Sequence, residues 1–246
     1  MSAQRNAGPW LLLAAACGLF AAAAHAPGLW AWLLGLLLPG EHVLLYPRAP
    51  LPVLLGEHLR LVGLSSSLAA AVGIPLGIAV TRRRGREFLP VVDDLAAVGQ
   101  TLPPVAVLAL AVPVLGFGAR PAVLALFLYS VLPILRNTVA GLEAVAPDLV
   151  ETASALGMTP WQTLRQVELP LALPLIASGL RTSVVINIGT ATVGAAIGAG
   201  GLGAPIIAGL VQHNPAFVLE GALPAAALAL LADACLGLAE KTLQRG

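Results

Sequence analysis

The chain has 246 residues, of which 58% are hydrophobic and only 10% are charged. Soluble domains carry about a quarter charged residues, so this composition indicates an integral membrane protein. The formal net charge of +1 gives no general attraction for nucleic acid. Cys17 and Cys235 stand in separate apolar runs without a C-x-x-C pair, so we expect small buried side chains and no disulfide framework.

The first apolar run, residues 9–38, exceeds the ~20 residues that cross a bilayer. It predicts a tilted transmembrane helix that is kinked near Pro27. The alternative is a cleaved signal peptide, with Arg5 ahead of the apolar stretch and Ala24-His25-Ala26 as the cleavage site. We favour the retained span, because the apolar run continues past that site.

A polar segment follows at residues 40–60, and we expect it to be a solvated external loop. His42 and His58 lie within it, but they lack the helical H-x-x-x-H spacing of a metal-binding pair. Residues 1–58 are therefore interpreted as an N-terminal membrane span with its external loop. Residues 59–246 would form the main transmembrane domain.

Five further apolar runs predict membrane spans at residues 61–80, 91–115, 122–135, 180–197 and 218–239. Together with residues 9–38, they predict an all-α, polytopic membrane protein of about six transmembrane helices. Residues 171–179 are expected to run along the inner surface, because Pro174 interrupts a helix there. Of 13 basic residues, only Arg48, Arg60 and Arg120 then lie outside, so the positive-inside rule places both termini in the cytoplasm.

Polar side chains mark two of these spans. Polar groups at membrane depth face protein or a water-filled path, which makes Asn187, Thr190 and Thr192 candidate pathway-lining residues. Hydrogen bonding between helices is the alternative for all three. Asp233 is expected to bond to a neighbouring helix or to reach the inner interface, and a proton relay would need partners that we do not find. The glycine-dense residues 194–209 predict a bent segment or close helix packing and no simple helix.

One polar island, residues 146–170, interrupts the apolar runs and predicts two short helices joined by a tight turn. Pro147 suits a first helical turn, and Gly157 suits a left-handed C-cap. Thr159 and Gln162 have the spacing of a capping box at the start of the second helix, and Pro170 is expected to end it. From spacing alone, the pair is either an interfacial hairpin on the bilayer or a docking surface for another protein.

The residues of the island resemble the EAA signature of ABC-importer permeases. The pattern is carried by Glu151-Thr152-Ala153, three residues, Gly157, nine residues, Val167, one residue and Leu169-Pro170. The chain departs from the family at Thr152 and Val167, where the family has Ala and Ile. The resemblance implies that residues 143–170 form a coupling loop that seats in a groove on a separate cytoplasmic ATPase. The residues implied in this coupling are Glu151, Ala153, Gly157, Val167, Leu169 and Pro170.

Residues 58–239 as a whole resemble the permease subunits of osmoprotectant importers, which carry glycine betaine, choline, carnitine and similar quaternary amines. The segments that carry the likeness are residues 77–82, 125–138, 157–162, 167–174 and 197–203. The resemblance implies three kinds of protein partner in a bacterial or archaeal cytoplasmic (inner) membrane. They are an external substrate-binding protein, ABC ATPase subunits and a second permease subunit, the same chain or a related one.

The sequence itself predicts no enzyme. It contains no G-x-x-x-x-G-K-[ST] loop, and its only lysine is Lys241, so ATP would be used by the partner and no cofactor, metal or catalytic residue is expected here. Trp10, Trp30 and Trp32 lie in the N-terminal segment, and we see no aromatic cage for a quaternary ammonium group. Solute selection is therefore expected to lie with the binding protein.

Three alternatives remain. An importer for methionine or another amino acid shares the coupling loop. An intramembrane enzyme would pair one of the serines of residues 65–67 with a histidine, although no catalytic motif surrounds them. An ion-driven secondary transporter would need inverted repeats and paired intramembrane charges, and we find neither in the sequence.

Overall fold

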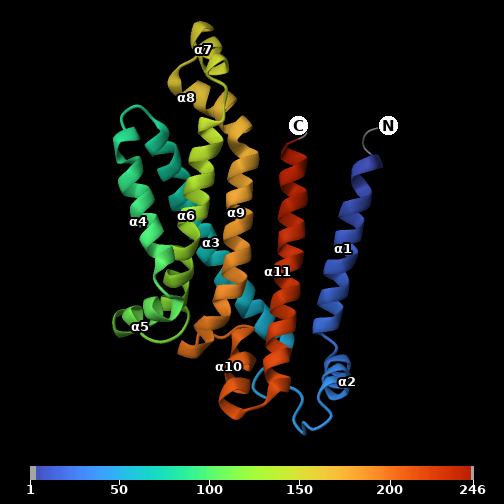
Figure 1. Ribbon diagram of the computed structural model, residues 1–246. Helices are drawn as coiled ribbons and strands as arrows, with labels where there is room; N and C mark the ends of the chain where they lie inside the picture. The colour runs from blue at the N-terminus through green and yellow to red at the C-terminus, as the bar shows by residue number, and fades with distance from the viewer. Residues whose placement is uncertain (1–3, 245–246) are drawn as a thin grey trace.

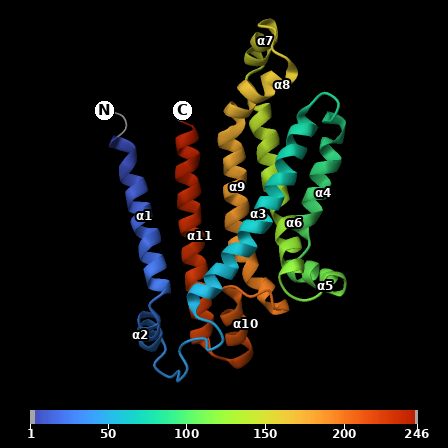
Figure 2. The ribbon, with the colours of Figure 1, turned by 180° about the vertical axis from the view of Figure 1, so that it is seen from behind.

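The computed structural model describes residues 4–244, and every regular element in that range is helical. Three long helices form the centre: α3 (Leu51–Thr81), α6 (Ala119–Glu143) and α9 (Leu169–Ala191). Helix α11 (Pro215–Leu243) packs against α9, and α1 (Gln4–Ala24) packs against α11. Figures 1 and 2 show the resulting upright bundle from opposite sides. The predicted all-α membrane fold is confirmed.

Small residues bring the central helices together. A Cβ atom at Gly77 of α3 would lie 2.8 Å from the Thr138 side chain of α6. A Cβ atom at Gly179 of α9 would lie 2.6 Å from Cβ of Asn137 on α6. Close approach through small residues is how membrane helices gain packing energy, since lipid offers no hydrophobic drive for their association.

Four helical segments are long and apolar enough to cross a membrane, and two bent helix pairs raise the number to six if each pair is one span. The first bent pair is α1 with α2 (Pro27–Leu37), at an angle of 83°. The second runs from the short η1 (Arg86–Phe88) through α4 (Leu89–Thr101) to α5 (Pro104–Leu115), at 95°. The kink expected near Pro27 is confirmed, and the expected span at residues 91–115 is likewise bent, between Thr101 and Pro104.

Proline explains both bends. Ala26 precedes Pro27, and Leu102 and Pro103 both precede a proline, which disfavours the helical conformation at each of these positions. Leu102 and Pro103 accordingly have extended ψ angles of 130° and 137°.

The external loop expected at residues 40–60 is shorter than predicted, because α3 begins at Leu51. Pro52 fits the first turn of the helix, where its missing N–H is not needed. Leu54, His58 and Leu61 recur at helical spacing and are buried against the neighbouring helices. The solvated segment therefore ends at Pro50, and the division at residue 58 falls inside a continuous helix.

Two prolines do not interrupt the helical segment that begins at the end of the polar island. Residues 160–197 form one long helical segment that consists of α8 (Pro160–Thr163), the π-helical η2 (Leu164–Glu168), α9 and the 3₁₀-helical η3 (Thr192–Ile197). Pro170 and Pro174 both lie inside it, so the predicted stop at Pro170 and the surface stretch at residues 171–179 were wrong. Neighbouring helices and local changes of helix type allow prolines in membrane helices.

The glycine-dense stretch forms no simple helix, as predicted. It contains η3, a turn and the short helix α10 (Gly203–Gln212). Gly198, Gly200 and Gly201 in the turn have φ angles of 78°, 81° and 73°, which side-chain-bearing residues rarely adopt. Glu57 of α3 accepts a hydrogen bond from the backbone N–H of Gly201 at 2.8 Å and fastens this turn to the bundle.

Two helices, α7 (Pro147–Ala155) and α8, project beyond one end of the bundle, and we call them the projecting pair. Figure 1 shows that α1 begins and α11 finishes at this same end. Helices α2, α5 and α10 lie at the opposite end. The bundle therefore has one end that carries the projecting pair and another where the short helices α2, α5 and α10 lie.

Candidate functional site

The turn of the projecting pair has the conformation that its sequence predicts. Pro147 occupies the first turn of α7, with Asp148 beside it. Gly157 has φ of 80°, in the left-handed region. The N–H of Gly157 donates to Ser154 O at 3.0 Å, and the N–H of Met158 donates to Ala153 O at 3.1 Å. These bonds satisfy carbonyls at the end of α7 and fix the direction in which the chain turns back.

A capping box starts the second helix. The backbone N–H of Thr159 donates to Oε1 of Gln162 at 2.8 Å, and the N–H of Gln162 donates to Oγ1 of Thr159 at 3.4 Å. Pro160 takes the first helical position. These bonds join residues within one helical turn, so the start of α8 is defined by its own sequence.

The projecting pair exposes large apolar side chains away from the bundle. Leu149, Leu156 and Trp161 have exposed fractions of 46%, 78% and 66%. Ala153 is buried in the contact between α7 and the helical segment that follows α8. Exposed apolar side chains on a rigid projection suit a protein partner or a lipid interface, as the two sequence alternatives require.

The six predicted coupling residues fall into two groups. Glu151, Ala153 and Gly157 lie on α7 and its turn, whereas Val167, Leu169 and Pro170 lie where η2 passes into α9. The second group connects the projecting pair to the bundle without a break in the helix. Helices α8 and α9 therefore belong to one continuous helical segment.

An ion pair that the sequence did not predict joins the same junction to α3. Glu168 is 8% exposed, and its Oε2 accepts a hydrogen bond from Nη1 of Arg82 at 2.7 Å. Arg82 is the residue that directly follows α3. The sequence analysis placed Arg82 only among the basic residues of the cytoplasmic side, because nothing in the local pattern shows which carboxylate it meets.

Asn187 lies at the centre of a buried polar cluster. Its Nδ2 lies 2.5 Å from Oγ of Ser130, 3.0 Å from Oγ of Ser66 and 3.1 Å from Oγ of Ser65. Asn187, Ser65 and Ser130 are 0% exposed, so the cluster joins α3, α6 and α9 inside the chain. These contacts correspond to hydrogen bonding between helices, which was the alternative to a pathway-lining role for Asn187.

Thr190 and Thr192 are partly exposed near the end of α9. The hydroxyl of Thr192 donates to Gly189 O at 2.7 Å, a bond within its own helix. Neither threonine belongs to the cluster around Asn187. A pathway-lining role for these two residues stays a prediction.

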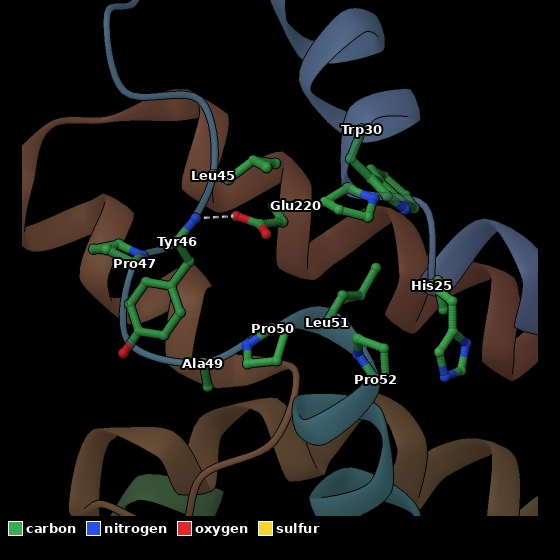
Figure 3. A pocket seen from close by; sticks show the side chains of 12 residues that line it. His25, Trp30, Leu45, Tyr46, Pro47, Ala49, Pro50, Leu51, Pro52 and Glu220 are labelled. Atoms are coloured by element: carbon green, nitrogen blue, oxygen red, sulfur yellow. Dashed lines mark hydrogen bonds between the residues drawn. The ribbon is translucent and has the colours of Figure 1, made fainter.

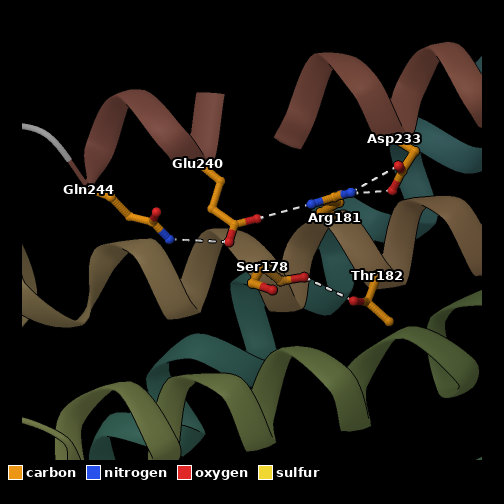
Figure 4. A network of polar contacts seen from close by, with 6 residues as sticks. All are labelled: Ser178, Arg181, Thr182, Asp233, Glu240 and Gln244. Atoms are coloured by element: carbon orange, nitrogen blue, oxygen red, sulfur yellow. Dashed lines mark hydrogen bonds and ion pairs between the residues drawn. The ribbon is translucent and has the colours of Figure 1, made fainter. Parts of the chain in front are cut away.

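A second polar cluster joins α9 to α11 (Figure 4). Arg181 donates from Nε and Nη2 to the two carboxylate oxygens of Asp233, at 2.7 and 2.8 Å, and from Nη1 to Glu240 at 3.3 Å. Gly237 makes room for the guanidinium group, since a Cβ atom there would lie 3.0 Å from Cζ of Arg181. Asp233 thus bonds to a neighbouring helix, as one of its alternatives predicted. This bidentate contact needs the two parallel N–H donors of a guanidinium group, which lysine lacks.

The comparison with protein families agrees with this architecture. The family described as "Binding-protein-dependent transport system inner membrane component" matches residues 73–245, which is more than half of the chain. The chain belongs to this family.

Individual relatives of this permease are close in sequence. It is 44% identical over 186 residues to the glycine betaine/carnitine/choline transport system permease protein OpuCB of Bacillus subtilis, which covers 76% of this chain and 85% of the relative. It is 47% identical over 180 residues to the osmoprotectant import permease protein OsmY of Salmonella typhimurium, covering 73% of this chain and 76% of that one.

Among solved structures, a chain of the methionine ABC transporter MetNI has a TM-score of 0.69 with this permease. The match covers 80% of this chain and 99% of the other, at 23% sequence identity. At this identity, the likeness establishes the shared membrane fold.

The geometry gives no support to an intramembrane enzyme. Nε2 of His58 bonds to Ile188 O at 2.9 Å, while the hydroxyl of Ser65 donates to Leu61 O at 2.8 Å. The hydrogen bonds among residues 4–244 include no pair between a serine and a histidine side chain. His58 is thus held by a carbonyl of α9, and the Ser65 hydroxyl is held by a carbonyl of its own helix, α3.

Proposed function

We propose that this permease is the transmembrane subunit of an ATP-driven importer for osmoprotectant quaternary amines such as glycine betaine, choline or carnitine. The observation that carries the proposal is its 44% identity to a permease named for glycine betaine, carnitine and choline transport. The coverage of 85% of that relative supports an equivalent role for the chain as a whole.

The projecting pair is the surface that meets the ATPase. Its exposed apolar side chains, Leu149, Leu156 and Trp161, fit a hydrophobic groove on a partner protein, in the manner of a helix in a groove. The turn at Gly157 sets the angle between α7 and α8. Because α8 continues through η2 into α9, closure of the ATPase subunits on ATP moves a membrane-spanning helix. That movement switches the transport path between its inward- and outward-facing states.

The orientation follows from the same surface. An ATPase acts in the cytoplasm, so the end of the bundle with the projecting pair faces inward, together with the start of α1 and the finish of α11. The positive-inside rule gives the same orientation from the arginines alone. An external binding protein then docks at the opposite end, and a second permease subunit completes the path.

Methionine or another amino acid is the competing cargo within the same class. The methionine transporter matches at only 23% identity, which concerns the fold, whereas the relatives above 40% identity are named for osmoprotectants. Sequence likeness therefore favours the quaternary amine.

The test is solute uptake into proteoliposomes that contain the permease, its ATPase and its binding protein. The panel comprises glycine betaine, choline, carnitine, proline and methionine, each with and without ATP. We expect uptake of at least one quaternary amine that stops when the ATPase is omitted. Uptake of methionine alone would reject the osmoprotectant, and uptake without any ATPase would reject the importer class.

A further inference from the structure

A cavity of about 500 Å³ lies between the N-terminal segment and α11, at the end of the bundle opposite the projecting pair. We call it the N-terminal pocket, and Figure 3 shows its lining. Most of its walls come from residues 24–52, which precede the region matched by the family model. Its volume falls in the range of small-molecule sites in proteins.

One carboxylate faces this pocket. Glu220, in the second turn of α11, is 4% exposed, and its Oε2 accepts a hydrogen bond from the backbone N–H of Tyr46 at 2.6 Å. Figure 3 shows its other oxygen directed toward the open centre of the pocket. The ion pairs among the described residues involve Arg82, Arg86, Arg136 and Arg181, and none of them reaches Glu220. A buried carboxylate with one hydrogen bond and no cation is costly to keep ionised, and a positive charge in the pocket would offset that cost.

Two aromatic residues line the same pocket, and both are held in place. The indole N–H of Trp30 donates to Ala23 O at 3.0 Å. The ring of Tyr46 packs edge-on against Phe217, with centroids 5.8 Å apart. Fixed rings lose little entropy on binding, and aromatic faces attract organic cations.

The remaining lining favours an organic cation over a metal ion. Pro47, Pro50 and Leu51 present apolar surface. Divalent metal ions need several oxygen ligands, whereas residues 4–244 contain no group of three side chains suited to a metal. A methylated ammonium group carries its charge on an apolar surface, so a single carboxylate with aromatic and apolar walls matches it.

We propose that the N-terminal pocket binds a small cation with a methylated ammonium group, with Glu220 as its counter-ion and Trp30 and Tyr46 against the methyl groups. The proposal goes beyond transport itself, because the site lies at the N-terminal segment and is formed within one chain. A zwitterion such as glycine betaine brings its own carboxylate toward Glu220 and binds more weakly than choline. The same headgroup chemistry occurs in free choline and in phosphatidylcholine.

Calorimetric titration of the full-length chain in phosphatidylglycerol nanodiscs tests the proposal, with choline and tetramethylammonium as probes. The neutral isostere 3,3-dimethyl-1-butanol and glycine betaine are the ligand controls. We expect saturable binding of both cations and at least about tenfold weaker binding of both controls, because the neutral isostere lacks the charge that Glu220 and the aromatic rings attract and glycine betaine adds a second carboxylate. Equal affinity for choline and its neutral isostere would overturn the proposal.

Variants separate the pocket from the rest of the chain. Glu220→Gln keeps the shape of the side chain and should weaken choline binding by about tenfold or more. Tyr46→Leu keeps the backbone N–H that holds Glu220 and removes the ring, so it tests the site even if the first variant misfolds. Glu41→Gln alters a carboxylate outside the pocket lining and should leave binding unchanged. Unaltered binding in both pocket variants would overturn the proposal.

A second set of nanodiscs identifies the source of the ligand. If the headgroup of phosphatidylcholine occupies the pocket, choline binds more weakly in nanodiscs of that lipid than in phosphatidylglycerol. If free solute is the ligand, the two lipids give equal affinities. These titrations contain no ATPase or binding protein, so a failure of the uptake experiment leaves their result unchanged.

Discussion

Glu168 accepts a hydrogen bond from Arg82 at 2.7 Å, and this contact joins the base of the projecting pair to the end of α3. Glu168 lies in the π-helical turn between α8 and α9, whereas Arg82 directly follows α3. The base of the projecting pair is therefore connected to two central helices, α9 and α3.

Glu168→Gln should reduce ATP-dependent uptake while the protein still inserts in the membrane. The neutral amide loses the charge-assisted bond. The side chain of Arg82 is already 37% exposed and keeps water as a partner, so we expect a loss of about 1–2 kcal/mol in the free energy of unfolding. Uptake and thermal unfolding of the purified permease measure the two effects. The reversed pair, Arg82→Glu with Glu168→Arg, should recover part of the uptake.

The matched control for this pair is Arg86→Gln. Arg86 meets Glu143 at 3.6 Å with side chains that are 72% and 47% exposed, so its loss should change stability little. If Arg86→Gln and Glu168→Gln impair uptake equally, the special role of the junction is refuted.

Gly157→Val should impair uptake more than Gly157→Asn. A Cβ atom at Gly157 meets nothing within 4 Å, so the effect comes from the backbone and not from crowding. Forcing a β-branched residue to φ of 80° costs roughly 1–2 kcal/mol or more and reorients α8, whereas asparagine visits this region more readily. Aspartate adopts the left-handed region about as asparagine does, so a loss of uptake in Gly157→Asp beyond that of Gly157→Asn would come from its charge on the turn.

Uptake rates at equal protein levels, checked by immunoblotting of membranes, measure the Gly157 series. ATPase co-purification with each variant reports whether the docking surface survives. Normal uptake by Gly157→Val would contradict a role for this turn in coupling.

Local chemistry made the projecting pair predictable. Gly157, Thr159 and Gln162 act within a few residues of one another, so their spacing determines the turn and the capping box before any other helix is present. The bends had local signals too, since Pro103 and Pro104 mark the break between α4 and α5. The bend angles depend on how the helices pack, and residue spacing does not determine that packing.

The features that the sequence analysis missed depend on contacts between residues that are far apart in the sequence. Pro174 predicted a helix break, yet contacts of α9 with α6 and α11 keep the helix continuous around it. His58 was assigned to a solvated loop because its neighbours are polar, but its bond to Ile188, 130 residues away, places it inside the bundle. The partner of Asp233 was likewise not identifiable, because Arg181 lies 52 residues away on another helix.

Asn187→Leu should separate the two roles considered for that residue. If Asn187 serves interhelical packing, the variant loses about 1 kcal/mol of stability, because Ser65 and Ser130 keep their own carbonyl partners. The apparent KM for the transported solute should then stay constant. Thr190→Val and Thr192→Val are the matched variants for the pathway, and we expect a raised KM with unchanged thermal stability.

The KM measurements use the proteoliposome assay, and stability is read from thermal unfolding in detergent. A raised KM in Asn187→Leu with unchanged stability would assign Asn187 to the transport path. Unchanged KM in both threonine variants would remove Thr190 and Thr192 from it.

Cys17 on α1 and Cys235 on α11 should form a disulfide when membranes are treated with copper phenanthroline. Their sulfur atoms lie 4.0 Å apart, so a small rotation of the side chains brings them into bonding range.

A protease site inserted in the loop between α2 and α3 allows a direct measurement of this disulfide. After cleavage, the two fragments should migrate together on a non-reducing gel and separate when a reductant is added. Cys17→Ser is the control, and it should give separate fragments under both conditions. The cross-link requires that residues 1–26 remain in the mature protein, so removal of a signal peptide at Ala26 would prevent it. Absence of the cross-linked species, with both cysteines still accessible to a small maleimide in unfolded protein, would instead refute the packing of α1 against α11.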